Sequence, residues 1–207
     1  YDAVIANYLT KEAGEAFPES FTMTYTKKQD LRYGENPHQK AAFYEAPIRS
    51  DHTLAAAKQL HGKELSYNNI QDTNAALQIV KEFSEPAVVA VKHMNPCGVG
   101  RGETLISAYT NAYEADPVSI FGGIIAANRE IDAETAAKMK EIFLEIIIAP
   151  SFSKEALDIL TEKKNLRLLT IDKESTSKDD KQLTSVSGGL LVQDVDRFTL
   201  EDADISI

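Results

Sequence analysis

The chain has 207 residues, a formal net charge of −10, 43% hydrophobic residues and 26% charged residues. A chain of this length buries roughly 70% of its unfolded surface, so it needs no cross-links to hold a core. The acidic balance argues against a nucleic-acid partner, because neutralising phosphates needs clustered Lys and Arg. No apolar run approaches the roughly 20 residues of a membrane span, so we expect no membrane partner.

Cys97 is the single cysteine of the sequence, which excludes an internal disulfide and a four-cysteine zinc site. This cysteine usage suits a reducing compartment, and we expect a cytoplasmic protein. The first residues, 1–3, have the features of neither a signal peptide nor a natural N-terminus. We therefore expect the chain to be part of a longer protein.

The N-terminal third alternates short predicted elements with polar connections. Apolar residues at helical spacing predict a helix over 2–9, and strict alternation predicts a half-buried strand over 21–26. A turn-rich stretch over 31–39 leads into a short strand over 41–44. After a polar loop, Asp72 is the expected N-cap of an amphipathic helix.

The middle of the chain alternates strands and helices. Strands are expected over 87–91, 121–127, 145–150, 166–171 and 188–193, and helices over 105–116, from Asp132 and from Ser153. This β-α-β-α-β-α-β order predicts an α/β fold with a parallel or mixed sheet and helices on both faces.

The stretch over 87–98 is the strongest candidate for a site. Five small apolar residues predict a strand buried on both faces, and the run stops at Lys92 and His93. The Asn-Pro pair that follows, with a glycine two residues later, predicts an irregular loop. In open α/β sheets, ligands bind at the carboxyl ends of strands. Two interpretations are open. Either a functional site lies here, or Lys92 and His93 merely cap the strand in solvent.

Lys92 and His93 together suit acyl-type transfer to a nitrogen nucleophile. A histidine whose pKa is near neutrality can take a proton from an attacking amine. A cation beside it can stabilise the oxyanion that forms when the amine adds to a formyl carbon. Because consecutive strand residues point to opposite faces, both can reach one site only if the chain is already leaving strand geometry, as the Asn-Pro pair allows.

Three further segments carry candidate binding residues, each with a structural alternative. Arg32 and Tyr33 suit a phosphate or carboxylate and a stacked ring, or are a surface arginine beside a half-buried tyrosine. The Phe-Gly-Gly segment at 121–123 can bring backbone close to a flat ligand, or form a bulge at the entry to a strand. Glu145 can accept hydrogen bonds from an amide or amine, or is the solvated first residue of a strand.

The Asn-Pro-Cys-Gly segment at 95–98 invites comparison with zinc deaminases, whose signature needs Pro-Cys-x-x-Cys and His-x-Glu. Position 100 is Gly rather than Cys, and His93 lies outside the required pattern. The zinc ligands cannot be assembled from these residues, so we expect no metal.

Five segments occur together in the order and spacing of one family. They lie at 31–39, 65–69, 91–98, 119–123 and 147–150, and include Arg-Tyr-Gly-Glu-Asn-Pro-His-Gln and Lys-His-Met-Asn-Pro. Over nearly all of its length the chain resembles the bifunctional purine biosynthesis proteins that join AICAR transformylase to IMP cyclohydrolase. The resemblance implies a cytidine-deaminase-like three-layer α/β/α fold with a mixed, largely parallel sheet and no zinc site. It also implies a linker from an absent cyclohydrolase domain over 1–20, the first half of the transformylase domain over 21–200, and the start of the connection to an absent second half over 201–207.

The resemblance further implies formyl transfer from 10-formyltetrahydrofolate to the 5-amino group of AICAR, giving FAICAR, in a parent protein that also cyclises FAICAR to IMP. In this reaction His93 would be the proton acceptor and Lys92 the transition-state stabiliser. The expected AICAR contacts are Arg32 (near the phosphate), Tyr33, Gly122 and Glu145 (where the family can carry Asp), with Asn95 and Phe121 in support.

In this family the second half supplies most of the folate site, and a homodimer completes the active site. We therefore expect the 207-residue chain alone to be inactive. The alternative is a non-catalytic nucleotide-binding or assembly module that keeps the fold. In that case Lys92, His93, Arg32 and Tyr33 would not converge on one pocket.

Overall fold

The computed structural model of the chain describes residues 2–14, 16–47, 53–172 and 181–196. Its contacts divide the chain into two units, 1–173 and 174–207. The predicted connection over 201–207 lies outside the described residues. The described residues of the second unit, 181–196, form an antiparallel hairpin of β9 (Lys181–Val186) and β10 (Gly189–Asp194).

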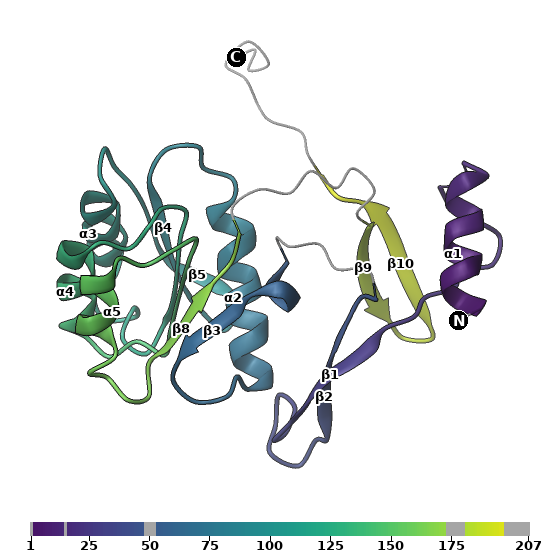
Figure 1. Cartoon of the computed structure of the whole chain (residues 1–207), viewed down its shortest axis with the longest axis horizontal. Coiled ribbons are helices and arrows are strands. Elements are labelled where there is room, and N and C mark those ends of the chain that lie inside the picture. Colours follow the sequence, from purple (N-terminus) through teal and green to yellow (C-terminus); the bar gives the residue numbers. More distant parts are fainter. Residues whose placement is uncertain (1, 15, 48–52, 173–180, 197–207) are drawn as a thin grey trace, which may run out of the picture. The chain divides into compact units, whose positions relative to one another are not determined.

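The first unit contains a six-stranded sheet, a separate hairpin and five helices within its described residues (Figure 1). The helices are α1 (Asp2–Glu12), α2 (Tyr67–Val80), α3 (Leu105–Ala115), α4 (Ala133–Lys140) and α5 (Lys154–Leu160), with a 3₁₀ turn at Leu54–Ala56. The hairpin strands are β1 (Thr26–Leu31) and β2 (Ala41–Glu45), and the sheet strands are β3 (Lys58–His61), β4 (Ala87–Lys92), β5 (Asn95–Arg101), β6 (Ile124–Ala127), β7 (Ile146–Ala149) and β8 (Arg167–Thr170).

The sheet is mixed, and its strand order is β3-β8-β7-β6-β4-β5. The neighbours β6 and β7, and β7 and β8, are parallel, whereas the other three neighbouring pairs are antiparallel. Strands β5, β6, β7 and β8 therefore run in one direction, and β3 and β4 run against them. The expected α/β fold with a mixed sheet is confirmed. The expectation of a largely parallel sheet holds in that four of the six strands run in one direction, although only two of the five neighbouring pairs are parallel.

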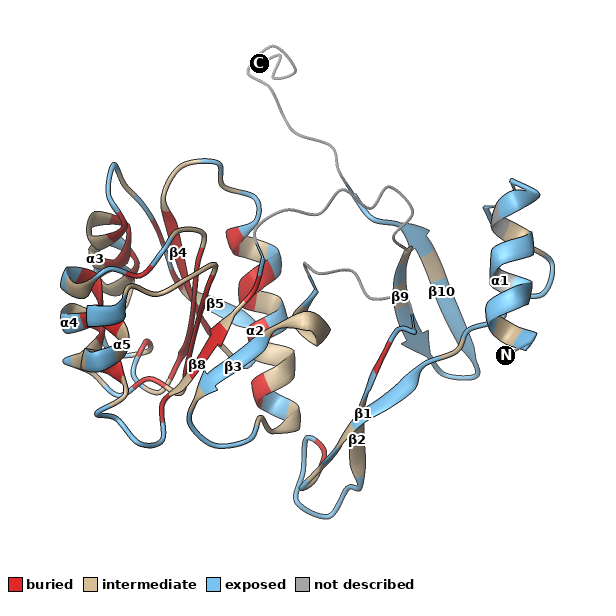
Figure 2. Cartoon of the chain, viewed as in Figure 1, coloured by how far each residue is buried: buried red, intermediate tan, exposed pale blue. Residues whose placement is uncertain are grey.

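Helices cover both faces of this sheet, which gives the three layers that were expected. Helices α3, α4 and α5 pack on one face and α2 packs on the other (Figure 1). Strand β4 shows why its sequence is continuously apolar. Val88 and Ala90 pack with the first group of helices, while Val89 and Val91 pack with α2. Each of these four side chains is 0% exposed, in agreement with the buried strand predicted over 87–91 (Figure 2).

The Asn-Pro-Cys-Gly segment forms the first four residues of strand β5 and not the irregular loop that its Pro and Gly predicted. The reason lies in how close α3 comes to this edge strand. A Cβ atom at Gly98 would lie 2.1 Å from the carbonyl oxygen of Ala112, and one at Gly100 would lie 2.1 Å from that of Ala108. The glycines therefore permit helix packing rather than a turn.

Two boundaries in the N-terminal part also differ from the prediction. No strand forms over 21–25, and β1 begins at Thr26, because Thr26 pairs with Glu45, the last residue of β2, so the pairing ends there. A tight loop joins β1 to β2. In this loop the N–H of Gly34 donates to the carbonyl of Gln39, at 2.8 Å. Helix α2 begins at Tyr67 rather than at Asp72, since Ser66 and Asn69 form a reciprocal capping box.

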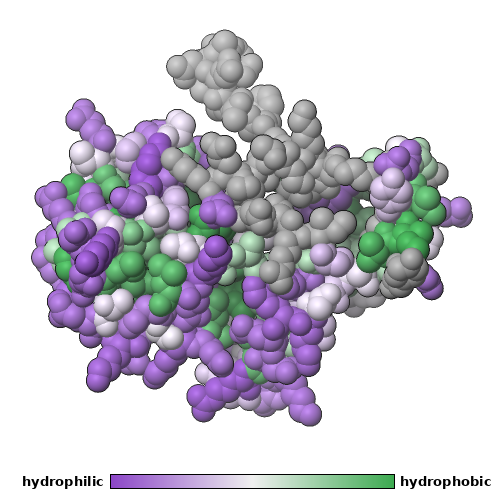
Figure 3. All heavy atoms as spheres, viewed as in Figure 1, coloured by the Kyte–Doolittle hydropathy of each residue, from purple (hydrophilic) through white to green (hydrophobic). Residues whose placement is uncertain are grey.

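Helix α1 confirms the helix predicted over 2–9 and leaves its apolar side chains in solvent. Val4, Ile5, Tyr8 and Leu9 are all exposed. Figure 3 shows hydrophobic side chains gathered over this helix. The predicted starts of α4 and α5 are also confirmed, since Asp132 and Ser153 are their N-caps.

We expect Gly100→Ala to destabilise the fold, because its methyl group would meet backbone of α3 and not a flexible side chain. Overpacking of this kind costs about 1–3 kcal/mol of unfolding free energy. Val99→Ala is the matched control, since Val99 is 39% exposed on the same strand and should lose at most about 0.5 kcal/mol. Urea unfolding of each variant measures both values, and equal stability of the two would contradict the close packing of α3 on β5.

Candidate functional site

Four of the predicted site residues, Lys92, His93, Gly122 and Glu145, lie at one end of the sheet, whereas Arg32 and Tyr33 lie on a separate loop. That end is not where the carboxyl-end rule alone would place the site. Because β4 runs against β6, the carboxyl end of β4 lies beside the amino ends of β6, β7 and β8. Val91 pairs with Ile124, which in turn pairs with Ile146. Lys92 therefore lies at the same end of the sheet as Gly122 and Glu145, which precede β6 and β7.

His93 and Met94 form the two-residue turn that joins β4 to β5. Lys92 pairs with Asn95 across the turn, and His93 and Met94 have φ angles of 54° and 61°. Positive φ at both positions is typical of a type I′ turn, which usually contains Asn-Gly. The left-handed conformation costs roughly 1–2 kcal/mol for a residue that has a Cβ. The chain thus leaves strand geometry at His93 itself, earlier than the Asn-Pro pair predicted.

Hydrogen bonds from two directions hold this turn. The carboxylate of Asp72 in α2 accepts from the N–H groups of His93, at 3.1 Å, and Met94, at 2.8 Å. The side-chain amide of Asn95 donates to the carbonyl of His93 at 2.7 Å. Both backbone groups of His93 are therefore engaged while its side chain is exposed. Asp72, predicted as an N-cap, instead lies in the second turn of α2 and bonds across to another element.

Lys92 is half-buried, and its ammonium group donates to the carbonyl of Phe121 at 3.1 Å. An ammonium group has three donors, so further donors remain for a ligand. The positive charge of Lys92 also affects the pKa values of two neighbouring groups, Asp116 and Cys97. Hydrogen bonds from the side chain and then the backbone of Ser119 mainly hold the pKa of Asp116 below its ordinary value, and Lys92 contributes to this shift. Burial raises the pKa of the Cys97 thiol, while Lys92 opposes the rise.

Phe121 and Gly122 form a turn that leads into β6. Gly122 has a φ of 73°, which residues with a side chain rarely adopt, and its N–H donates to the carbonyl of Phe143 at 2.7 Å. The rings of Phe121 and Phe143 are in contact, with centroids 5.5 Å apart. The segment is therefore a fixed turn before the strand, and it places the Phe121 carbonyl against Lys92.

Glu145 is held by other side chains and is more than a solvated strand end. The amide of Asn69 donates to its Oε2 at 2.8 Å, and the guanidinium of Arg167 lies 4.0 Å from the same oxygen. Asn69 is only 5% exposed, so this contact forms part of the packing of α2. The carboxylate of Glu145 is thus fixed at the same end of the sheet as Lys92.

Arg32 and Tyr33 lie on the β1–β2 loop, where the guanidinium stacks on the ring with 5.7 Å to its centroid. Arg32 is exposed and Tyr33 is half-buried. In the described part of the chain, no hydrogen bond or ion pair joins either residue to Lys92 or His93. The loop is instead linked to the start of α2, where the amide of Asn68 donates to the carbonyl of Glu35 at 3.5 Å.

The sequence interpretation missed the polar residues at the start of α2. Asn68, Asn69 and Asp72 contact the β1–β2 loop, Glu145 and the 93–94 turn, respectively. Asp72 follows Asn69 by three residues and Asn68 by four, so the three polar side chains are neighbours on the helix surface. This spacing is the sequence signal that indicates a polar cluster at the start of α2. The family resemblance includes residues 65–69 but implies no role for them.

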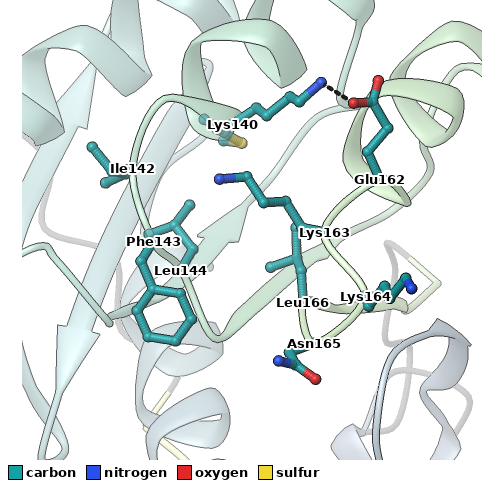
Figure 4. A pocket seen from close by; sticks show the side chains of 10 residues that line it. Lys140, Ile142, Phe143, Leu144, Glu162, Lys163, Lys164, Asn165 and Leu166 are labelled. Carbon is teal, nitrogen blue, oxygen red and sulfur yellow. Dashed lines mark hydrogen bonds and ion pairs between the residues drawn. The ribbon is translucent and has the colours of Figure 1, made fainter.

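A separate hollow lies between the end of α4 and the segment that precedes β8 (Figure 4). Lys140 and Glu162 form an ion pair of 2.5 Å at its rim, and Phe143 and Leu144 line it. Phe143 is its connection to the candidate site, through the ring of Phe121.

Within the described residues, no group of three or more His, Cys, Asp and Glu side chains is placed to hold a metal ion. The same residues include no helix that is long and apolar enough to cross a membrane.

The fold is therefore a three-layer α/β/α protein with a lysine and a histidine where an interior strand ends. The family model described as "AICARFT/IMPCHase bienzyme" matches residues 1–207, and the chain belongs to this family. It is 69% identical over 207 residues to "Bifunctional purine biosynthesis protein PurH" of Bacillus cereus (strain AH187) and of Bacillus anthracis (strain A0248). These matches cover 100% of this chain and 40% of each relative, so the chain spans less than half the length of the curated relatives it matches.

Among solved structures, the chain is similar to one described as "Acinetobacter baumannii RibD, form 1". The TM-score is 0.39 at 14% identity, and the match covers 47% of this chain and 35% of that chain.

We expect Asn69→Ala to lower the free energy of unfolding by about 1–3 kcal/mol, because it removes buried hydrogen bonds to Ser66 and Glu145. Asn68→Ala is the matched control, since Asn68 is exposed and its one described bond is 3.5 Å long. We expect that control to change stability by less than about 0.5 kcal/mol. Urea unfolding compares the two, and a loss in Asn69→Ala no larger than that in Asn68→Ala would contradict the stabilising role of the Asn69 hydrogen bonds.

Proposed function

We propose that the parent protein transfers a formyl group from 10-formyltetrahydrofolate to the 5-amino group of AICAR, giving FAICAR, and also cyclises FAICAR to IMP. Family membership supports this proposal, and so does the whole-chain similarity to proteins named for purine biosynthesis. The observation that carries it is the placement of Lys92 and His93 at one end of the sheet, together with the turn at Phe121 and the carboxylate of Glu145.

His93 acts as the proton acceptor in this proposal. The amine nitrogen of AICAR attacks the formyl carbon, a C–N bond forms, and His93 takes a proton from that nitrogen. The amine is delocalised into the imidazole ring and carboxamide, so it is a poor nucleophile and needs this proton removal. The bond from the formyl carbon to N10 of the folate then breaks, and N10 receives a proton as tetrahydrofolate leaves.

Lys92 stabilises the oxyanion that develops on the formyl oxygen. Its ammonium is anchored by one hydrogen bond to Phe121, which fixes its position and leaves further donors for the oxyanion. A charge that is already in place when the oxyanion forms needs no reorganisation during the reaction.

AICAR is held by the remaining predicted residues. Arg32 binds the phosphate, since a guanidinium can form two parallel hydrogen bonds to phosphate oxygens. Tyr33 contacts the nucleotide. Because the N–H of Gly122 already donates to Phe143, a backbone contact with AICAR goes through its carbonyl. Glu145 accepts from the carboxamide or amine, and Asn95 and Phe121 act indirectly by fixing His93 and Lys92.

We propose the following domain arrangement for the parent protein. Residues 1–20 link an N-terminal cyclohydrolase domain to the first transformylase half over 21–200, and a second half follows. That second half holds most of the folate site, and the intact protein is a cytoplasmic homodimer. The ratio of chain lengths, 40% of the relatives, is consistent with an arrangement of this kind.

Two substitutions in the full-length protein separate binding from chemistry. We expect His93→Ala to lower the rate of formyl transfer by about 10²- to 10⁴-fold while AICAR still binds, because only proton transfer is lost. We expect Arg32→Ala to weaken AICAR binding by about tenfold or more, the effect of one lost charge-assisted contact. Calorimetry and steady-state kinetics measure the two effects.

Arg101→Ala is the control for Arg32→Ala, because Arg101 is another exposed arginine that stacks on an aromatic ring, 6.0 Å from the centroid of Phe83. It should leave both quantities unchanged. Retained transfer in His93→Ala would refute the proton acceptor. AICAR binding by the unsubstituted protein without turnover would favour the non-catalytic module instead.

The isolated 207-residue chain should show little or no formyl transfer, because most of the folate contacts lie elsewhere in the parent protein. The full-length protein, assayed side by side with AICAR and 10-formyltetrahydrofolate, should turn over. Substantial turnover by the isolated chain would contradict the assignment of most of the folate site to the second half.

A further inference from the structure

We propose that Asp72 is a positioning residue for His93, and that it acts by holding the 93–94 turn in its left-handed conformation. The inference rests on the proposed function, because the effect of Asp72 on the rate passes through the proton acceptor. Asp72 itself touches neither substrate nor reacting atoms in this scheme. Its carboxylate binds two consecutive backbone N–H groups, of His93 at 3.1 Å and Met94 at 2.8 Å.

The turn needs an external restraint because its sequence does not favour its own conformation. His93 and Met94 have φ angles of 54° and 61°, and neither is the Gly that a type I′ turn usually carries in its second position. An ionised carboxylate that accepts two backbone N–H groups forms stronger bonds than a neutral acceptor would. Asp72 therefore supplies, from α2, the stabilisation that Asn-Gly would supply from within the turn.

Helix α2 is a rigid support for this carboxylate. The helix is packed into the core through Ala76, Leu77 and Val80, which are between 0% and 4% exposed. Its N-terminus is fixed by the capping box of Ser66 and Asn69. The backbone of His93 is thus held from two sides, by the carboxylate of Asp72 on a helix buried against the sheet and by the side-chain amide of Asn95 in β5.

This arrangement predicts a loss of rate without a matching loss of binding. A displacement of a catalytic group by about 1 Å can cost on the order of 10²-fold in rate. Arg32 and Tyr33, which hold AICAR in the proposed function, lie on a different loop from the turn. Removing Asp72 should therefore lower kcat and leave the affinity for AICAR nearly unchanged.

The test uses four variants of the full-length protein. We expect Asp72→Ala to lower kcat about 10- to 100-fold. Asp72→Asn should have a smaller effect, because its amide oxygen can still accept from one N–H. In Asp72→Ala combined with Met94→Gly, part of the rate should return, since Gly adopts positive φ without a steric cost. Asp132→Ala, which removes an N-cap of α4, should lower stability and leave kcat unchanged.

Hydrogen exchange at the amides of His93 and Met94 gives a second readout that does not depend on activity. Both amides should lose protection in Asp72→Ala and keep it in Asp132→Ala. Unchanged protection or unchanged kcat in Asp72→Ala would overturn the role of Asp72, and so would a failure of Met94→Gly to restore any rate. Absence of formyl transfer in the unsubstituted protein would instead overturn the proposed function, while the exchange data would still show whether Asp72 holds the turn.

Discussion

The candidate site depends on hydrogen bonds from the first two turns of α2 to three segments that are far away in the sequence. Asn68 donates to the loop of the β1–β2 hairpin, Asn69 donates to Glu145, and Asp72 accepts from the 93–94 turn. These bonds span 33, 76 and 21 residues of sequence. One capped helix thereby connects the predicted phosphate-binding loop, the carboxylate and the proposed proton acceptor.

The direction of β4 determines which residues can join this group. Since β4 is antiparallel to both of its neighbours, its carboxyl end meets the turn before β6 and the residue before β7. A parallel β4 would have placed Lys92 at the opposite end of the sheet from Gly122 and Glu145. The two-residue turn into β5 also keeps His93 at this end of the sheet, because the chain turns back at once and Lys92 pairs with Asn95.

Much of the fold could be predicted from the sequence because it is encoded locally. The buried apolar run of β4 and the N-caps Asp132 and Ser153 follow from short patterns. The direction of β4 could not be predicted in this way, since a strand covered on both faces has the same apolar pattern in either direction. Strand β5 could not be predicted in this way either. Its glycines allow the close approach of α3, and a contact between separate elements leaves no local pattern in the sequence.

The individual residues of the candidate site could be predicted from the sequence, but the contacts that hold them together could not. The family motifs pointed to Lys92, His93, Arg32 and Glu145 as individual residues, yet local patterns do not reveal bonds that span tens of residues. The turn at His93 also gave no signal, because His-Met is not a typical turn sequence. Asp72 was therefore interpreted as a cap, the usual role of an aspartate near the start of a helix.

A crystal structure of the full-length protein with AICAR bound is the most direct measurement. We expect one AICAR molecule whose amine lies within about 3.2 Å of the His93 ring, in hydrogen-bond reach, with Lys92 beside the reacting nitrogen and Arg32 on the phosphate. AICAR bound at another end of the sheet, or bound with Arg32 while the 93–94 turn faces away from it, would contradict this assembly of the site.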